Sequence, residues 1–362
     1  MMRKTEKRKT AFLQKNSQLL IPIIAILIIA VFNLFRDPSF FSIDMVVNNQ
    51  GNSVLKGNLI SIISNASELV ILALGMTLVT ASSGGQDISV GCQAAIAGSV
   101  FVKVLKGAGA VTPWTFILAL FAACIVTMIF ASLNGTLVAI FKIQPMIATL
   151  ILFTCGRSIA YWINGGATPT INSPILQAMG SFIPGCPIPT PILIEIFVGI
   201  LFIILFKTTT LGLYVQTVGI NQGAAKLNGI NPIKMKLVSF IILGACCALA
   251  GSIGVARLGL INHETLMYGI EMDAILAVAI GGNSLGGGKF NLVGSVLGAI
   301  AIQALTVTLY AMKVPSTDIQ AYKAIVIIIL VVCGSPVVKE EFQKIKKKIT
   351  AIRKLSDGRE AA

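Results

Sequence analysis

The chain has 362 residues, of which 55% are hydrophobic and only 12% are charged, and its mean hydropathy is +0.88. A soluble domain of this length has no need of so much apolar surface, so the composition excludes a soluble globular protein and indicates a polytopic membrane protein. The net charge of +14 includes a basic cluster at each end of the chain. Because each cluster adjoins an apolar segment, the positive-inside rule explains the clusters better than nucleic-acid binding does.

Ten apolar segments predict an all-α fold of about ten transmembrane helices, because several of them reach the roughly 18 apolar residues that cross a bilayer. A transmembrane β-barrel would instead show short alternating segments. No small-residue cleavage site follows the first segment, so we expect it to remain as an anchor. The predicted spans are 18–35, 59–81, 88–105, 114–140, 146–163, 190–206, 236–256, 272–283, 291–311 and 322–338.

Charge predicts the orientation of these helices. The basic tails 1–17 and 339–362 flank the transmembrane domain 18–338, and both tails are expected in the cytoplasm. An even number of crossings then places the loops 141–145 and 207–235 on the cytoplasmic side as well. The second of these loops carries three lysines and no acidic residue, in agreement with the rule.

The stretch GGQDISVG (84–91) interrupts two apolar segments. Gly84 and Gly85 can adopt backbone angles that other residues avoid. Asp87 is suited to cap a helix that starts at Ile88, where its charge meets the positive helix end. Alternatively, free backbone N–H groups line a polar cavity there, because irregular backbone at membrane depth needs protein or water around it. In that interpretation the polar side chains of the cavity are Gln86, Asp87 and Ser89.

A second interruption, GGNSLGGGK (281–289), follows the short span 272–283, which predicts a discontinuous helix. The stretch is not a Walker A phosphate-binding loop, because Lys289 is followed by Phe290 rather than by Ser or Thr. Both interruptions run from an apolar segment into Gly-Gly-polar and then into a small-residue helix. This pattern is typical of transporters whose internal repeats bring broken helices together, but chance glycine richness explains it equally well.

Other polar side chains lie within the predicted spans, where each is costly in lipid and should face the bundle interior or an interface. The amides of Asn134 and Gln303 lie deep and can bridge helices or contact a hydroxylated ligand. Arg157 and Asp273 lie near span ends, where interfacial anchoring is the simpler explanation. The remaining members of this set are Glu68 and Glu195.

The sequence contains few of the residues that a metal site or an enzyme active site would need. The seven cysteines form no CxxC pair, and the only histidine is His263. A zinc site is therefore not expected, and the cysteines are most simply small apolar residues at helix interfaces. A single histidine and the absence of an HExxH pattern also argue against an intramembrane enzyme.

The loop 208–236 is long for a connector, since helix–helix connections usually take about 2 to 8 residues. It contains the helix-permissive stretch QGAAKL (222–227), bracketed by Gly219 and Gly229, with Pro232 as a stop. A short helix in such a loop can dock in a groove on a partner. An ordinary solvated connector is the alternative.

Four stretches resemble, in the right order, motifs of permease subunits from bacterial sugar-uptake ABC transporters of the ribose and galactose type. GGQDISVG is similar to the signature Gly-Gly-x-Asp-[Leu/Ile]-Ser-Val-Gly. VGINQGAAKLNGI (218–230) is similar to the cytoplasmic loop Gly-x-Asn-x-x-Ala-Ala-x-x-x-Gly-[Ile/Val]. SLNGTLVAIFKIQPMIATL (132–150) resembles the fourth span and its loop, and 268–299 resembles the block Tyr-Glu-Leu-Asp-Ala…Gly-Gly-x-Ser-x-x-Gly-Gly. The resemblance covers about residues 58 to 335.

The resemblance implies a passive permease that moves a monosaccharide, pentose or hexose, or a sugar-like solute across the bacterial inner membrane. It also implies a second permease subunit, alike or different, a separate ATPase that binds ATP and Mg²⁺, and a periplasmic or lipoprotein-anchored sugar-binding protein. The chain itself would bind no cofactor or metal and would not hydrolyse ATP.

The resemblance implies that the loop is the coupling helix that sits in the ATPase cleft, through Asn221, Gly223, Ala224, Ala225, Lys226 and Gly229. The polar interruptions and deep amides described above predict a substrate pathway. Its residues are Gly84, Gly85, Gln86, Asp87, Ser89, Asn134, Asn283, Ser284 and Gln303.

Two features depart from the family pattern. The family commonly has an acidic residue before the Ala-Ala pair, whereas Gly223 stands there in this chain, so the loop lacks a charge that could meet a basic residue on the ATPase. This departure leaves open that the chain is the less active half of a heterodimer. The outer segment 164–189 is also free of charge.

Two other functions remain open. An ion-coupled secondary transporter of a small polar solute would need deep carboxylates as cation sites, for which Glu68, Asp87 and Glu195 are the candidates. A nucleoside-importing ABC permease is the other.

Overall fold

The computed structural model describes residues 19–47 and 52–334, so the predicted basic tails 1–17 and 339–362 lie outside the described residues. The described residues are mostly helical, which confirms a polytopic α-helical membrane protein. Seven of their helices are long and apolar enough to cross a membrane: α3 (Asn58–Ser83), α4 (Val90–Gly107), α5 (Pro113–Ala139), α6 (Pro145–Ile163), α8 (Thr190–Thr208), α11 (Pro232–Leu258) and α13 (Leu292–Ala311).

The other three predicted spans are helical but shorter. They are α2 (Leu20–Arg36), α12 (Ile270–Ile280) and α14 (Ile319–Gly334). The 11 residues of α12 give a length of about 16 Å, roughly half of the bilayer core. Helix α12 is therefore the short, discontinuous helix expected at 272–283. The total of ten crossings and the side on which the termini lie stay predictions.

The chain divides into two units, residues 1–308 and 309–362. The second unit holds α14, and every site described below lies in the first. Within the first unit α2 is tied to α13, because Asn33 Nδ2 donates a hydrogen bond to Thr308 Oγ1 at 2.8 Å.

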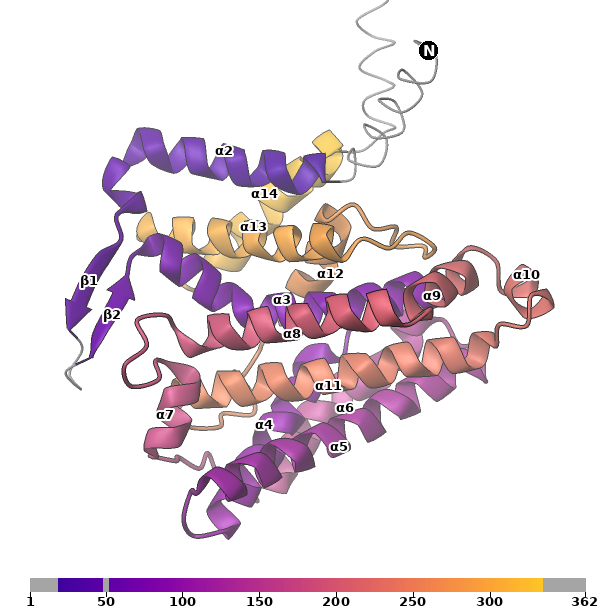
Figure 1. Cartoon of the computed structure of the whole chain (residues 1–362), viewed down its shortest axis with the longest axis horizontal. Helices are drawn as coiled ribbons and strands as arrows, with labels where there is room; N and C mark the ends of the chain where they lie inside the picture. The colour runs from indigo at the N-terminus through magenta and orange to yellow at the C-terminus, as the bar shows by residue number, and fades with distance from the viewer. Residues whose placement is uncertain (1–18, 48–51, 335–362) are drawn as a thin grey trace, which may run out of the picture. The chain divides into compact units, whose positions relative to one another are not determined.

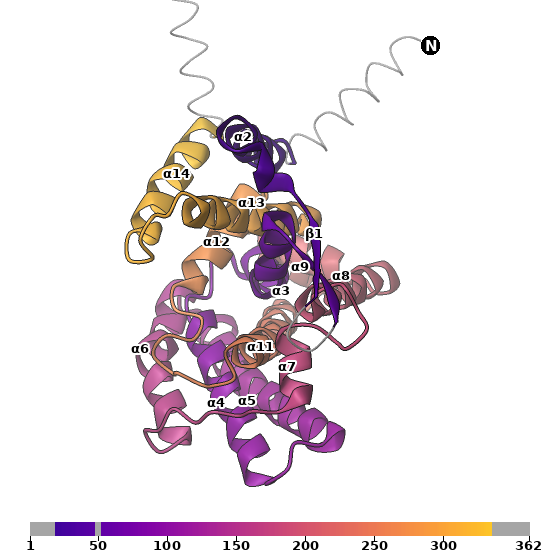
Figure 2. The same ribbon diagram turned by 90° about the vertical axis from the view of Figure 1, so that its left-hand side faces the viewer.

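Helices α3 and α11 form the core of the first unit. Helix α11 packs against α3, α4 and α5, and α3 also contacts α8, α9 and α12 (Figures 1 and 2). Small residues allow this close packing: a Cβ at Gly251 of α11 would lie 2.2 Å from the carbonyl oxygen of Ala94 on α4. Cys246 and Cys247 of α11 are buried free thiols, as expected for small apolar residues at helix interfaces.

The degree of burial separates core helices from lipid-facing ones. In α3 and α11, 72% of the most apolar window is buried, whereas the values for α5 and α8 are 22% and 33%. Helix α5 nevertheless has the highest hydropathy of the seven, at 2.6. An apolar surface left uncovered by protein is what a lipid-facing helix requires.

Several short elements of the first unit were not predicted. An antiparallel hairpin, β1 (Asp44–Val47) and β2 (Ser53–Lys56), follows α2 and the 3₁₀ turn η1 (Pro38–Phe41). Helix α7 (Pro174–Gly180) lies within the uncharged segment 164–189. The hairpin joins this segment through a 3.0 Å hydrogen bond from Leu55 N to the carbonyl of Pro187.

The loop predicted between 207 and 235 is largely helical. Helix α8 continues to Thr208, α9 spans Leu211–Ile220, and α10 spans Gln222–Leu227, so the predicted helix QGAAKL is confirmed. Pro232 does not act only as a stop, because it is the first residue of α11. Asn231 caps that helix by accepting the N–H groups of Ile233 and Lys234.

The predicted cytoplasmic loops lie at one end of the first unit, which we call the α10 end. In Figure 1, α10 lies at the opposite end from α7 and the β1–β2 hairpin. Residues of the 141–145 loop and of the segment around α10 line one pocket. Their location on the same side agrees with the charge-based orientation.

Candidate functional site

The first glycine-rich interruption forms a break between α3 and α4. Helix α3 ends at Ser83 and is capped by Gly84, whose φ of 69° lies in the left-handed region that glycine adopts at helix ends. Gly85 lies against the ring of Pro145, the first residue of α6. Helix α4 begins at Val90 rather than at Ile88 as predicted, because the two residues after Asp87 form a turn.

Asp87 is the centre of a buried polar network at this break. Its Oδ1 accepts the N–H of Ser89 at 2.7 Å and the Ser89 hydroxyl at 2.5 Å, and its Oδ2 accepts Gln93 Nε2 at 3.3 Å. Asn134 of α5 donates to Ser89 Oγ at 3.0 Å. Asp87 is 0% exposed. The prediction that it caps α4 is wrong, because the N-cap residue is Ser89 and no side chain caps this helix. The contacts of Asp87 instead fix the turn before α4, and Ser89 ties that turn to α5.

The second interruption forms a break between α12 and α13, centred on Asn283. Asn283 Oδ1 accepts the N–H of Asn291 at 2.7 Å, while its Nδ2 donates to the Val278 carbonyl at 3.1 Å and to Ser295 Oγ at 2.9 Å. Ser295 Oγ in turn lies 2.6 Å from the hydroxyl of Thr77 on α3. The amide thus closes the break and connects it to the core helix.

The two breaks lie against each other. Gln86 Nε2 donates to the carbonyl of Leu285 at 2.8 Å, and Gly288 N donates to the carbonyl of Ala81 at 3.1 Å. The structure thus joins two interruptions about 200 residues apart, as expected for broken helices that meet. Ser284 is half-buried beside this contact. Gln303 lies further along α13, outside both networks.

Helix α9 packs directly onto both breaks through Gly219. A Cβ at this position would lie 1.8 Å from the carbonyl oxygen of Ala81 and 2.6 Å from the backbone nitrogen of Gly288. Only glycine fits in this space. Position 219 therefore links the segment that leads to α10 with the last turn of α3 and with the segment between α12 and α13.

We expect the substitution Gly219→Val to separate α9 from the two breaks. Overpacking of a close contact typically costs about 1–3 kcal/mol, and here the valine must displace α9 because its neighbours are backbone atoms. Hydrogen exchange should become faster at the Gly288 amide, which loses its carbonyl partner. Gly199→Val is the matched control, since a Cβ there meets nothing within 4 Å. Unchanged exchange at Gly288 in the Gly219 variant would contradict the assignment.

Helix α10 has one buried and one exposed face. Asn221 caps it by accepting the N–H of Ala224 at 3.0 Å, and Ala225 is 0% exposed. Leu227, by contrast, is 91% exposed. The remaining predicted coupling residues, Gly223, Ala224, Lys226 and Gly229, are all exposed. The sequence analysis missed Leu227, and its apolar side chain beside Lys226 in a loop was the available signal.

An ion pair joins the two core helices α11 and α3 away from the two breaks. Arg257 Nε, in the last turn of α11, lies 2.5 Å from Glu68 Oε1 on α3. Its guanidinium also donates to the carbonyl of Ser64 and, at 3.3 Å, to Asn65 Oδ1. Nearby, Glu195 of α8 accepts the hydroxyl of Ser67 at 3.1 Å. Glu68 therefore has a cationic partner that the sequence analysis did not identify.

Arg157 holds the chain between α11 and α12. Its Nη1 donates to the carbonyls of His263 and Glu264, both at 2.8 Å, and its guanidinium lies 5.4 Å from the centre of the Tyr268 ring. The side chain predicted to anchor α6 at a lipid interface thus binds protein backbone. The predicted anchor Asp273 lies in the first turn of α12, where a carboxylate favours the helix start.

The described residues contain no group of three or more His, Cys, Asp or Glu side chains that could hold a metal ion.

Comparison with known proteins extends over most of the chain. Residues 58–334 match the family model described as branched-chain amino acid transport system / permease component, close to the range 58 to 335 found by the motifs. The galactofuranose transporter permease protein YtfT of Escherichia coli (strain K12) is 39% identical, over 86% of this chain and 88% of that protein.

Two further relatives are similar over comparable lengths. The fructose import permease protein FruF of Bifidobacterium longum (strain NCC 2705) is 32% identical, over 96% of this chain and 97% of its own length. The ribose import permease protein RbsC of Escherichia coli (strain K12) is 33% identical, over 85% of this chain and 91% of its own length. No solved structure matches the chain.

Proposed function

Because the chain belongs to the family of branched-chain amino acid transport system permease components, we propose that it is the permease subunit of an ATP-binding-cassette importer for a sugar. The observation that carries this proposal is similarity over at least 85% of the chain to permeases named for galactofuranose, fructose and ribose. The solute is therefore a monosaccharide or a close analogue. As a permease subunit, the chain forms the passage and leaves ATP hydrolysis to another protein.

Helix α10 is the contact for that ATPase. Its exposed face, with Leu227 at the tip, stands at the end of the bundle where the predicted cytoplasmic loops gather. Ala225 and Asn221 support the helix from within and define its start. Exposed apolar surface at the tip of a short, capped helix suits insertion into a groove on a partner.

Force from the ATPase would reach the pathway through Gly219. Helix α9 joins α10 to the backbone of Ala81 and Gly288, so movement of α10 presses on both breaks. The candidate pathway residues Gln86, Asp87 and Asn283 are buried and hydrogen-bonded at those breaks. Opening of the pathway at this end would exchange these internal bonds for bonds to sugar hydroxyls or water.

The ion-coupled alternative is less favoured by the geometry. All three candidate carboxylates have partners within the protein: Glu68 pairs with Arg257, Asp87 accepts hydrogen bonds from Ser89 and Gln93, and Glu195 accepts the Ser67 hydroxyl. A carboxylate engaged in this way is poorly placed to exchange a cation during each transport cycle. A nucleoside importer of the ABC type would use the same machinery with a different solute.

The complete importer would contain a second permease subunit, the ATPase with ATP and Mg²⁺, and a sugar-binding protein on the outer side of the inner membrane. In proteoliposomes holding these components, we expect uptake of one labelled sugar from a panel of galactofuranose, fructose, ribose and a nucleoside, only when ATP is supplied. Uptake driven by an ion gradient without the ATPase would reject the proposal, and uptake of the nucleoside alone would favour the alternative solute.

A further inference from the structure

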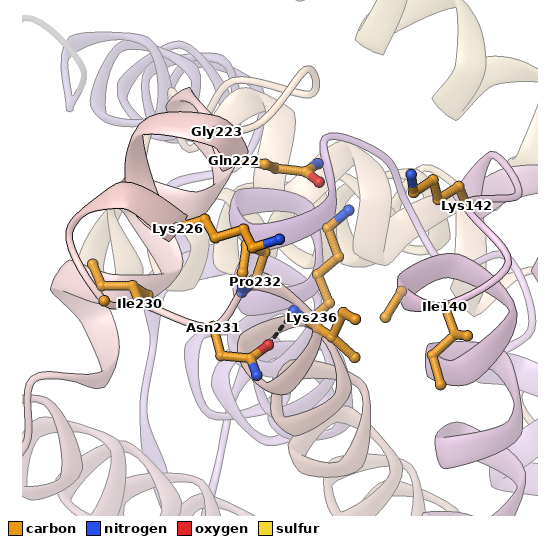
Figure 3. Close-up of a pocket in the computed structure, with 12 residues that line it drawn as sticks. Ile140, Lys142, Gln222, Gly223, Lys226, Ile230, Asn231, Pro232 and Lys236 are labelled. Atoms are coloured by element: carbon orange, nitrogen blue, oxygen red, sulfur yellow. Dashed lines mark hydrogen bonds between the residues drawn. The ribbon is translucent and has the colours of Figure 1, made fainter.

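A pocket at the α10 end is not accounted for by the pathway or by the coupling helix alone. It has a volume of about 600 Å³ and lies between α10, the start of α11 and the turn that follows α5. Figure 3 shows that Lys142, Lys226 and Lys236 reach it from these three elements. Ile140 and Ile230 add apolar surface to its walls.

The pocket carries concentrated positive charge. The segments that line it, 139–142 and 222–236, contain no acidic residue. Among the residues that the structure describes, the ion pairs are those of Arg257 and His263, so none of the three lysines is neutralised by the chain itself. A pocket of this kind attracts an anionic group.

Lys236 differs from most lysines at a membrane surface because its side chain is largely covered by protein. It is only 7% exposed and lines the same pocket as Lys142. The positive-inside rule explains exposed lysines at a membrane surface, but it does not explain a buried lysine aimed into a pocket without a partner. Three lysines without an acidic partner around one pocket favour an anionic group there, so a carboxylate or phosphate is expected from outside the chain.

The backbone conformation of Lys142 also supports a role for its charge in the pocket. Its φ of 57° places it in the left-handed region, which is unfavourable for a non-glycine residue. Glycine would relieve this cost in the turn after α5, but it would remove the charge from the pocket.

The position of the pocket indicates its occupant. Lys226 belongs to α10 and is followed by Leu227, so any protein that covers the tip of α10 also covers the mouth of the pocket. Helix α10 itself has no acidic residue. We propose that the pocket receives one or more carboxylate side chains of the ATPase subunit, which pair with Lys142, Lys226 and Lys236 when the ATPase docks. This inference rests on the proposed function.

The test measures binding of the purified ATPase to the full-length chain in nanodiscs, as a function of salt concentration. For Lys236→Gln combined with Lys142→Gln we expect a Kd about 30-fold higher, as for loss of one side of buried charge pairs. The salt dependence of binding should also become shallower, because fewer charges are screened. Lys234→Gln is the matched control: this lysine is exposed, lies two residues from Lys236 and does not line the pocket.

Three results would contradict the proposed pairing of ATPase carboxylates with these lysines. A double variant that binds the ATPase with unchanged Kd and salt dependence would refute it while leaving the proposed function in place. If native mass spectrometry of that variant also showed loss of a bound anionic phospholipid, the occupant would be a lipid headgroup instead. Failure of the unmodified chain to bind its ATPase would reject the proposed function and this inference with it. Unchanged circular dichroism would establish that the variants are folded.

Discussion

The substitution Leu227→Asp is expected to abolish docking of the ATPase while the transmembrane helices stay intact. Leu227 is 91% exposed at the end of α10, so the free chain should lose little stability when it is replaced. In the proposed complex the aspartate would put a charge where Leu227 makes an apolar contact with the ATPase. We expect a loss of at least about 2 kcal/mol, roughly 30-fold in Kd, measured by recovery of the ATPase with the chain.

Two comparisons make this experiment specific. Ile183→Asp replaces an apolar residue that is 43% exposed in the segment beside α7, at the other end of the unit, and should not affect ATPase docking. Ala225→Glu should also prevent docking, but for a different reason: Ala225 is buried, so the glutamate unfolds α10 and speeds hydrogen exchange there. Normal recovery of the ATPase with the Leu227 variant would show that α10 is not the contact.

The substitution Arg257→Met is expected to cause the largest loss of stability in the first unit. Glu68 is only 6% exposed, and the Arg257 guanidinium is the cation that faces it. Removal of one partner from a buried pair leaves an uncompensated charge and costs about 3–5 kcal/mol. The melting temperature of the chain in detergent should therefore fall markedly.

The double variant Glu68→Met with Arg257→Met provides the control for this prediction. Replacement of a whole buried ion pair by apolar residues is often nearly neutral, so the second substitution should restore most of the lost stability. Arg257→Lys should give an intermediate value, since it keeps the charge but loses the planar donors that reach Ser64 and Asn65. An Arg257→Met variant as stable as the original chain would contradict the structural role of the pair.

Local patterns in the sequence were enough to predict much of this molecule. Apolar length located helices in all ten predicted spans, glycine located the break after α3, and the stretch QGAAKL gave the bounds of α10. Each of these depends on residues within one or two turns of each other. The predicted start of α4 was wrong by two residues, because Asp87 precedes a turn at 88–89 and does not cap the helix.

Features that depend on packing could not be predicted in the same way. Arg257 lies 189 residues from Glu68 along the chain and resembled an ordinary basic residue at a span end. Lys236 was similarly hidden, because burial and the lack of a partner emerge only when α5, α10 and α11 are in place. The short β1–β2 hairpin has too few residues to produce a clear alternating pattern.

The contact at Gly219 limits how α9 can move relative to the two breaks. The backbone of α9 already touches Ala81 and Gly288, with no room for a single additional carbon atom. A movement of α9 toward the two breaks would therefore displace their backbone at once. A displacement of a fraction of an ångström at α9 must be absorbed by the backbone at the two breaks. If the proposed ATPase acts through α9, a short displacement is therefore enough, and the stiffness of this contact decides how much of the displacement reaches the two breaks.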